Sequence, residues 1–378
     1  MKRWRQNLDY VEKRRGRNLD ATGAGPYIKL GIAVFALAAA VLALVFVIVP
    51  VIRGSFSGNI AWRGRTPAPD EDASVTPAVP ALITSSAKSF SLNADKGEAV
   101  MVDPVIIGDT LVFASGDTEE ACGRIVCYNL DTRRRETIEP VFENDSLRMP
   151  RANEEYLVWF DAKADGGGNI CVRSFVTGAD IVLVQLTKGM PELLLDGRYL
   201  VFMAQSGLGA KLYAIDLSTF EPLTLALLPA ESYAASTPDI AAGRVYFPVE
   251  GGVRVADLSA GGQWDIAIDG YVHDPRAIGE GLLWLTGDHG GDTDLHYLAA
   301  DGTTLRIAQS VIHAGVAEGC IAFGRDGTVY AYSLPMERIY MISGAEEYAQ
   351  LVAAGGNYIL WRVLSDGEAP AYRYLRVN

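Results

Sequence analysis

Short apolar segments recur along most of the chain at a nearly constant spacing. Seven of them begin at successive intervals of 46, 43, 45, 38, 38 and 38 residues. They are Leu111-Val112-Phe113, Leu157-Val158-Trp159, Leu200-Val201-Phe202, Val245-Tyr246-Phe247, Leu283-Trp284-Leu285, Ile321-Ala322-Phe323 and Ile359-Leu360-Trp361. A turn sequence precedes each segment, further short apolar stretches follow it, and no amphipathic helix separates the units. This pattern predicts an all-β fold made of evenly spaced short strands.

The length of the repeat points to one architecture. Units of about 40 residues with four strands each are typical of β-propeller blades, which stack around an axis. The region 89–378 divides into seven such units, which predicts a seven-bladed β-propeller; dividing the first two repeats differently gives eight blades, and omitting the last gives six. The last unit is one strand short. A strand near Phe90-Ser91-Leu92 or near Ala99-Val100-Met101 is expected to complete it and close the ring.

A different segment precedes the repeats. Leu30 to Ile52 is a run of 23 residues without a charge. As a helix it would span about 34 Å, enough to cross a hydrocarbon core of about 30 Å. We therefore predict one N-terminal transmembrane signal-anchor helix over 30–52. A cleaved secretory signal is the alternative, but its apolar region is usually shorter and ends at small residues, whereas Arg53 follows here.

Charge orients this helix. Residues 1–29 hold eight Lys and Arg against three Asp and Glu, a net charge of +5, which leaves −18 for the rest of a chain whose total is −13. The positive-inside rule places 1–29 in the cytoplasm as a basic tail and the rest outside the cell membrane. The region 53–88 is rich in Pro, Ala, Ser and Thr and is expected to be a tether. An acidic domain argues against a nucleic-acid partner.

Two kinds of repeat are visible within the propeller region. Asp196 to Phe202 followed by Lys211 to Leu217 resembles the TolB-type bacterial propeller repeat. Asp326 to Tyr332, and Thr237 to Ile240 with Gly243 to Phe247, resemble the BamB or quinoprotein type of repeat. Trp159, Trp284 and Trp361 lie in the first strong strand of their units instead of late in the unit, so no quinone cofactor is expected. The resemblance covers 89–378 and implies a binding platform.

Catalytic and metal motifs are absent from the sequence. It has no G-x-S-x-G in a strand-to-helix context, no H-E-x-x-H and no G-x-x-x-x-G-K. The four cysteines contain no C-x-x-C pair, and their spacing favours free thiols without deciding the disulfide state of Cys122, Cys127, Cys171 and Cys320. The acidic loop from Asp288 to Asp294, before His296, has metal-ligand residue types but lacks the spacing of a calcium loop. We therefore assign no catalytic residue, no metal and no cofactor.

One pattern marks a candidate site. A proline precedes the strong strand of five repeats, at Pro104, Pro150, Pro191, Pro238 and Pro275, and His313 begins the corresponding segment of the sixth. We interpret these prolines as entries to the innermost strands, which would meet around the mouth of the central channel. The charged or titratable residues near them are the candidate ligand-binding set: Arg148, Arg151, Glu192, Asp239, His273, Asp274, Arg276 and His313.

Two interpretations of this set remain open. The charges either compensate one another around a water-filled channel or bind an anionic or peptide-like ligand. The favoured function is a membrane-anchored, extracytoplasmic recognition or scaffolding module for a protein, peptide or cell-envelope ligand. The alternatives are an enzyme, a lyase or hydrolase using Asp239 or His273 as acid or base, and a purely structural spacer in an envelope complex.

Overall fold

The computed structural model describes the propeller region of the chain. The described residues are 81–82, 86–93, 96–141, 143–206, 209–228, 236–287, 293–344, 346–365 and 369–377. They all belong to one compact unit, 61–378. The predicted cytoplasmic tail over 1–29 and the predicted transmembrane helix over 30–52 lie outside the described residues. Within those described, no helix is long and apolar enough to cross a bilayer.

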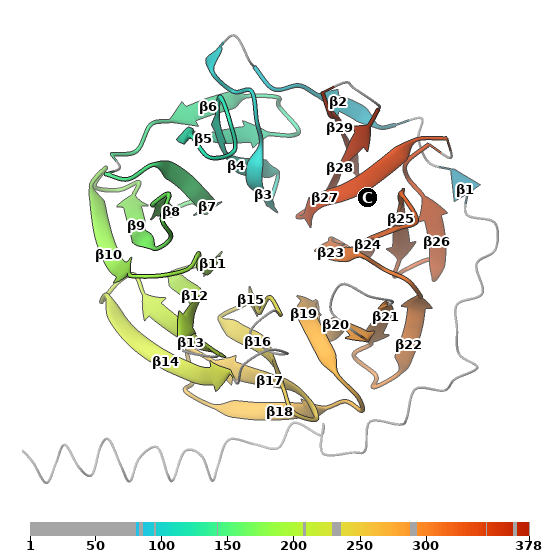
Figure 1. The fold of residues 1–378 in the computed structure, drawn as a ribbon. Coiled ribbons are helices and arrows are strands. Elements are labelled where there is room, and N and C mark those ends of the chain that lie inside the picture. Colours follow the sequence, from blue (N-terminus) through green and yellow to red (C-terminus); the bar gives the residue numbers. More distant parts are fainter. Residues whose placement is uncertain are drawn as a thin grey trace, which may run out of the picture. The chain divides into compact units, whose positions relative to one another are not determined.

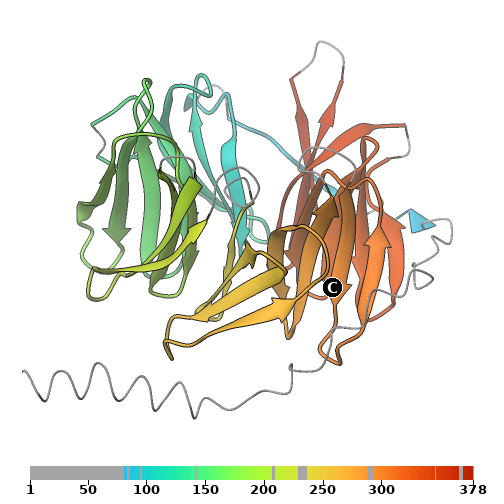
Figure 2. The same ribbon diagram turned by 60° about the horizontal axis from the view of Figure 1, so that its bottom comes forward.

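Seven sheets stand around a common axis, which confirms the seven-bladed propeller (Figure 1). We number these blades in chain order. In the tilted view of Figure 2 the strands of each blade run along the axis, and successive blades lie face to face. The first three blades are β3 (Val102–Ile107), β4 (Thr110–Gly116), β5 (Cys122–Asn129) and β6 (Arg135–Ile138); β7 (Ser146–Ala152), β8 (Tyr156–Ala162), β9 (Gly168–Ser174) and β10 (Asp180–Leu186); and β11 (Glu192–Asp196), β12 (Tyr199–Ser206), β13 (Gly209–Asp216) and β14 (Glu221–Leu228).

The remaining blades repeat the same order from the axis outward. Blades 4 and 5 are β15 (Asp239–Ala241), β16 (Arg244–Val249), β17 (Gly252–Asp257) and β18 (Gln263–Ala267), then β19 (Val272–Ile278), β20 (Gly281–Gly287), β21 (Thr293–Leu298) and β22 (Thr304–Ala308). Blade 6 is β23 (His313–Ala317), β24 (Cys320–Arg325), β25 (Thr328–Ser333) and β26 (Arg338–Met341). Blade 7 has three strands in this order, β27 (Tyr348–Gly355), β28 (Tyr358–Leu364) and β29 (Ala371–Arg376).

The hydrophobic core lies between the blades. Each blade is an antiparallel meander, so alternate side chains of its second strand face the preceding and the following blade. In β28, Ile359 and Trp361 pack on blade 6, while Tyr358 and Leu360 pack on blade 1. The seven strong apolar segments lie within these second strands, and they are apolar at each position because both faces of the strand are buried there.

An N-terminal strand completes blade 7. β2 (Lys88–Phe90) pairs antiparallel with β29, with Phe90 opposite Tyr372, which confirms the expected closing strand near Phe90. A second short strand, β1 (Ala81–Leu82), pairs parallel with β26 on the outside of blade 6. Strand pairing therefore begins within 53–88, the range expected to be the tether, because the outer edges of blades 6 and 7 have backbone groups that these residues can bond.

Candidate functional site

The innermost strands of blades 1, 2 and 5 each contain a bulge. Pairing with the second strand skips Asp103-Pro104 in β3, Met149-Pro150 in β7 and Asp274-Pro275 in β19. The residue before each proline has a positive φ of 49–50°. A proline is tolerated there because the innermost strand is the free edge of its sheet. The prediction that these prolines mark strand entries was therefore wrong for three blades. It is correct for blades 3 and 4, where Pro191 and Pro238 directly precede β11 and β15.

We call the ends at which the innermost strands begin the inner rim. The first polar contact on it joins blades 1 and 2. Nε and Nη2 of Arg148 donate hydrogen bonds to the two carboxylate oxygens of Asp103 over 2.8 and 3.3 Å. The backbone N–H of Met149 donates to the same carboxylate over 2.9 Å. The side chain of Asp103, in the bulge of blade 1, therefore bonds the backbone of Met149, in the bulge of blade 2.

A second ion pair joins blades 2 and 3. Nη2 of Arg151 lies 3.3 Å from Oε1 of Glu192, and Nη1 donates to the backbone carbonyl of Pro150 over 2.9 Å. Burial raises the pKa of the Glu192 carboxyl group, although the charges of Arg151 and Arg276 act in the opposite direction. This pair is therefore poorly hydrated, and each charge is stabilised mainly by the opposite charge of its partner.

Asp274 joins blades 5 and 4. Its carboxylate accepts a hydrogen bond from the backbone N–H of Thr237 over 2.7 Å, and its own N–H donates to Oγ of Ser236 over 2.8 Å. Nδ1 of His273 lies 3.3 Å from the other carboxylate oxygen. Burial opposes ionisation of Asp274, but these bonds from His273 and Thr237 and the charge of Arg276 together hold its pKa below the ordinary value.

Asp239 and Arg276 complete the contact between blades 4 and 5. The Asp239 carboxylate accepts from the N–H of Ala277 over 2.8 Å, and Nη1 of Arg276 donates to the carbonyl of Pro238 over 2.8 Å. Burial raises the pKa of Asp239 and outweighs the lowering effect of Arg276 and of backbone N–H groups. Seven of the eight predicted residues are thus used in contacts within and between neighbouring blades. The geometry agrees with the interpretation in which the charges compensate one another.

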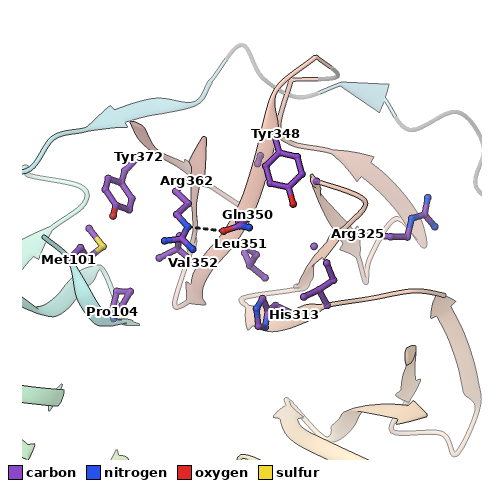
Figure 3. A pocket seen from close by; sticks show the side chains of 14 residues that line it. Met101, Pro104, His313, Arg325, Tyr348, Gln350, Leu351, Val352, Arg362 and Tyr372 are labelled. Carbon is purple, nitrogen blue, oxygen red and sulfur yellow. Dashed lines mark hydrogen bonds between the residues drawn. The ribbon is translucent and has the colours of Figure 1, made fainter. Parts of the chain in front are cut away.

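The eighth residue, His313, lies apart from these pairs. It is exposed at the start of β23, and its side chain makes no hydrogen bond or ion pair with the residues that the structure describes. Two cavities lie on either side of it, of about 370 and 340 Å³, and both are lined by Ile312 and His313. The smaller cavity also reaches Asp274 and Arg276. Figure 3 shows the larger one, which extends from His313 to Tyr372 and Met101.

The sequence interpretation missed the polar side chains of blade 7. Gln350, Arg362 and Tyr372 line the larger cavity. The proline pattern could not find them because the seventh repeat has no proline before its strong strand. The pairing of the strands shows the equivalence: Gln350 pairs with the second strand of blade 7 at the position that Arg148 and His313 occupy in their own blades.

Replacing Asp239 by asparagine should change how stability depends on pH. Because the folded-state pKa of Asp239 is raised above 3.8, its contribution to stability is complete below that value and is lost as pH rises through the folded pKa. The variant keeps the oxygen that accepts from Ala277 but does not titrate. Unfolding in urea at several values between about pH 3 and 7 should show the variant gaining stability relative to the parent as pH rises.

Asp265 supplies a control with the opposite sign. Its hydrogen bonds from Arg254 hold its pKa below 3.8, so its stabilising contribution is present above that value and lost in acid. Asp265→Asn should therefore lose stability relative to the parent as pH rises. Parallel pH profiles for the two variants would contradict the assigned environments.

His296 of blade 5 and the four cysteines lie outside the inner rim. No group of three or more His, Cys, Asp or Glu side chains is placed to hold a metal ion among them, and residues 288–292 of the acidic loop lie outside the described ranges. His296 is buried in blade 5, where it stacks on Trp284. All four cysteines are free thiols, and burial raises the pKa of Cys171 and of Cys320 to about 12, which makes both poor nucleophiles.

Comparison with known proteins supports the fold. No known family model matches the sequence, and no curated protein does so either. Among solved structures, the β-propeller domain of the Trilobed protease from Pyrococcus furiosus is 14% identical with a TM-score of 0.55, over 73% of this chain and 93% of that one. That domain is described as having an open velcro topology, whereas β2 pairs with β29 here.

Two enzymes show the same architecture. An oligogalacturonate lyase in complex with manganese is 10% identical with a TM-score of 0.53, over 78% of this chain and 97% of that one. The acylaminoacyl peptidase of Pyrococcus horikoshii is 12% identical with a TM-score of 0.54, over 76% of this chain and 54% of that one. Identities this low show a shared propeller fold alone, and the resemblance to TolB- and BamB-type repeats stays a prediction.

Proposed function

We propose that this protein is a membrane-anchored, non-catalytic recognition module that binds a protein or peptide at the inner rim of its propeller. The observation that carries the proposal is the pair of cavities that meet at Ile312 and His313. Each has the volume of a ligand-binding pocket, and each is lined by apolar side chains with a few polar groups. Ile312 is 63% exposed between them, as a contact residue for a bound partner would be.

The anchor is the apolar segment 30–52. Its length and the basic residues before it support a single span with the N-terminus in the cytoplasm. The propeller would then stand outside the cell membrane on the segment between the span and β1. A partner in the cell envelope fits this placement.

An enzyme at the same rim is the alternative, and Asp239 is its best candidate. A carboxyl group with a raised pKa suits acid-base catalysis. However, the Asp239 carboxylate already accepts from the Ala277 N–H, and Arg276 already bonds the Pro238 carbonyl. These groups hold blades 4 and 5 together, and we therefore propose recognition and keep the enzyme as the alternative.

Site-specific crosslinking in cells tests the recognition role. A photo-reactive residue at position 312 is placed between the cavities. The same residue at Met336, which is 59% exposed, is the matched control. Met336 lies in the turn between β25 and β26, on the opposite side of the ring from the inner rim, beside the turn at Gly319.

We expect adducts of one defined mass from position 312 and none of that mass from position 336. Mass spectrometry should identify the same partner when the photo-reactive residue replaces Tyr348, which also lines the larger cavity. Equal adducts from both faces, or none from position 312, would favour the structural-spacer alternative over recognition.

A further inference from the structure

Blades 7 and 1 converge at one end and separate at the other. Near the end of β27, Gly355 lies directly against blade 1: a Cβ atom there would be only 2.1 Å from the carbonyl oxygen of Ile106. Towards the inner rim, residues of blade 6 line one part of the cavity of about 370 Å³, and Gln350 of blade 7 and Pro104 of blade 1 line the part between blades 7 and 1. The space between them is therefore a cleft that closes away from the rim. We call it the 7–1 cleft.

Three polar side chains form a row across blade 7 in this cleft. Arg362 pairs with Gln350 on one side and with Tyr372 on the other. Nε of Arg362 donates a hydrogen bond to Oε1 of Gln350 over 2.9 Å (Figure 3). Because side chains alternate along a strand, Arg362 shares a sheet face with Tyr358 and Leu360, and that face packs on blade 1.

The other six blades carry no charge at the position of Arg362. Strand register gives the equivalent residues, because each pairs with the third strand at the matching place. They are Ala114, Phe160, Met203, Pro248, Leu285 and Gly324, and their third-strand partners are Ile125, Ile170, Leu212, Val253, Leu295 and Val329. Six blades therefore have an uncharged residue at this position, and blade 7 has an arginine there, beside a tyrosine.

The guanidinium of Arg362 forms no ion pair with the described residues, although the charge of Glu119 acts on the neighbouring Tyr372. No Asp or Glu lines the cavity, and Arg362 takes part in no ion pair there. Arg148 and Arg151, on the same rim, each bond a carboxylate. Arg325 also lines the cavity, but its side chain points away from the cleft in Figure 3, and it lies 3.6 Å from Asp326.

We propose that the 7–1 cleft binds the C-terminal carboxylate of a peptide against Arg362. This inference rests on the proposed recognition function and names the ligand chemistry. A guanidinium with free N–H groups matches a carboxylate in a two-bond geometry. Within its sheet β27 pairs only with β28, so the part of its other edge beyond Ala349, whose N–H bonds the carbonyl of Gly327, can accept an extended peptide backbone. Met101 and Val352, which pack with blades 7 and 1, offer apolar contacts for side chains.

Peptides with and without a free carboxylate test the proposal. The probe is a panel of N-acetylated pentapeptides that vary in their last residue, each prepared as the acid and as the amide. Retention on the immobilised full-length protein in detergent is measured by mass spectrometry. The parent protein should retain acids about tenfold more strongly than the matching amides, and Arg362→Leu should lose this preference.

Arg325→Leu is the matched control, because it removes an arginine that lines the cavity but points away from the cleft, and it should keep the preference. Arg362→Leu installs the residue that blade 5 has at Leu285, and circular dichroism with a melting curve checks that it folds. Arg362→Lys keeps the charge without the two-bond geometry and should show an intermediate preference.

Three results would overturn the proposal: equal retention of acids and amides, a preference that survives in Arg362→Leu, and no retention of either form. Equal retention accompanied by crosslinking at position 312 would leave the recognition function standing and remove only the carboxylate. Retention of oligogalacturonate in place of peptides would assign the carboxylate to a sugar acid, against the peptide proposed.

Discussion

Replacing Arg135 by alanine is expected to destabilise the propeller by about 3–5 kcal/mol. Glu98, in the segment between β2 and β3, is 1% exposed and forms an ion pair with Arg135 of β6. Nη2 of Arg135 also donates to the carbonyl of Ser91 over 2.8 Å, and its guanidinium lies 5.4 Å from the ring centre of Phe90. Among the described residues, the variant would leave the buried carboxylate with only the hydroxyl of Thr137, which is 3.3 Å away.

Urea unfolding measures this loss, and a second arginine calibrates it. Arg254 bonds both oxygens of Asp265 over 2.6 and 2.8 Å, but this pair is exposed on blade 4, so Arg254→Ala should cost less than about 1 kcal/mol. Adding Glu98→Gln to Arg135→Ala should recover part of the stability, because it removes the unpaired charge. Equal losses for Arg135→Ala and Arg254→Ala would contradict the role of burial.

Phe90→Ala should cost a similar amount, about 3–5 kcal/mol, for a different reason. Phe90 is the buried residue of the closing strand, at 4% exposure. Its ring makes edge contacts with Phe113 and Tyr128 of blade 1 and with Tyr372 of blade 7, with centroid distances of 6.0, 4.9 and 6.2 Å. Truncating it removes contacts on both sides of the junction that closes the ring.

Hydrogen exchange distinguishes local opening of the ring from general weakening. In Phe90→Ala, amide protection should fall most in β2 and β29 and least in blades 3 and 4. Phe175→Ala is the control, because Phe175 is 42% exposed, and its replacement should change stability by less than about 0.5 kcal/mol. A uniform loss of protection around the ring would show that β2 has no special part in closure.

Much of the architecture could be predicted because each second strand is buried on both faces. Such strands are runs of apolar residues that stand out from polar turns, and Trp361 and Leu360 show why: neighbouring positions pack on opposite blades. The closing strand could be predicted as well, since a blade one strand short leaves an open edge. The predicted count of seven blades then followed from dividing the region 89–378 by a repeat of about 40 residues, with six and eight as alternatives.

The candidate site was predictable only in part. The charged residues of the inner rim were found from their place beside the prolines, but their partners were not, since pairing across blades depends on bulges such as the one at Met149. The local sequence does not predict that the residue before a proline will have a positive φ. Arg362 was missed because, taken alone, it is one polar residue in an apolar strand, and its meaning appears only when seven strands are aligned by their pairing.

The closing strand also imposes an order of events on the newly made chain. Phe90 and its partner Tyr372 are separated by 282 residues, nearly the whole propeller. At roughly 5–20 residues per second, β2 is synthesised about 15 to 60 seconds before its partner exists. During that interval the aromatic side chains of blade 1 that contact Phe90 can already pack on it, while the edge towards blade 7 stays open. Synthesis of β29 is therefore the step that allows a row of blades to become a ring.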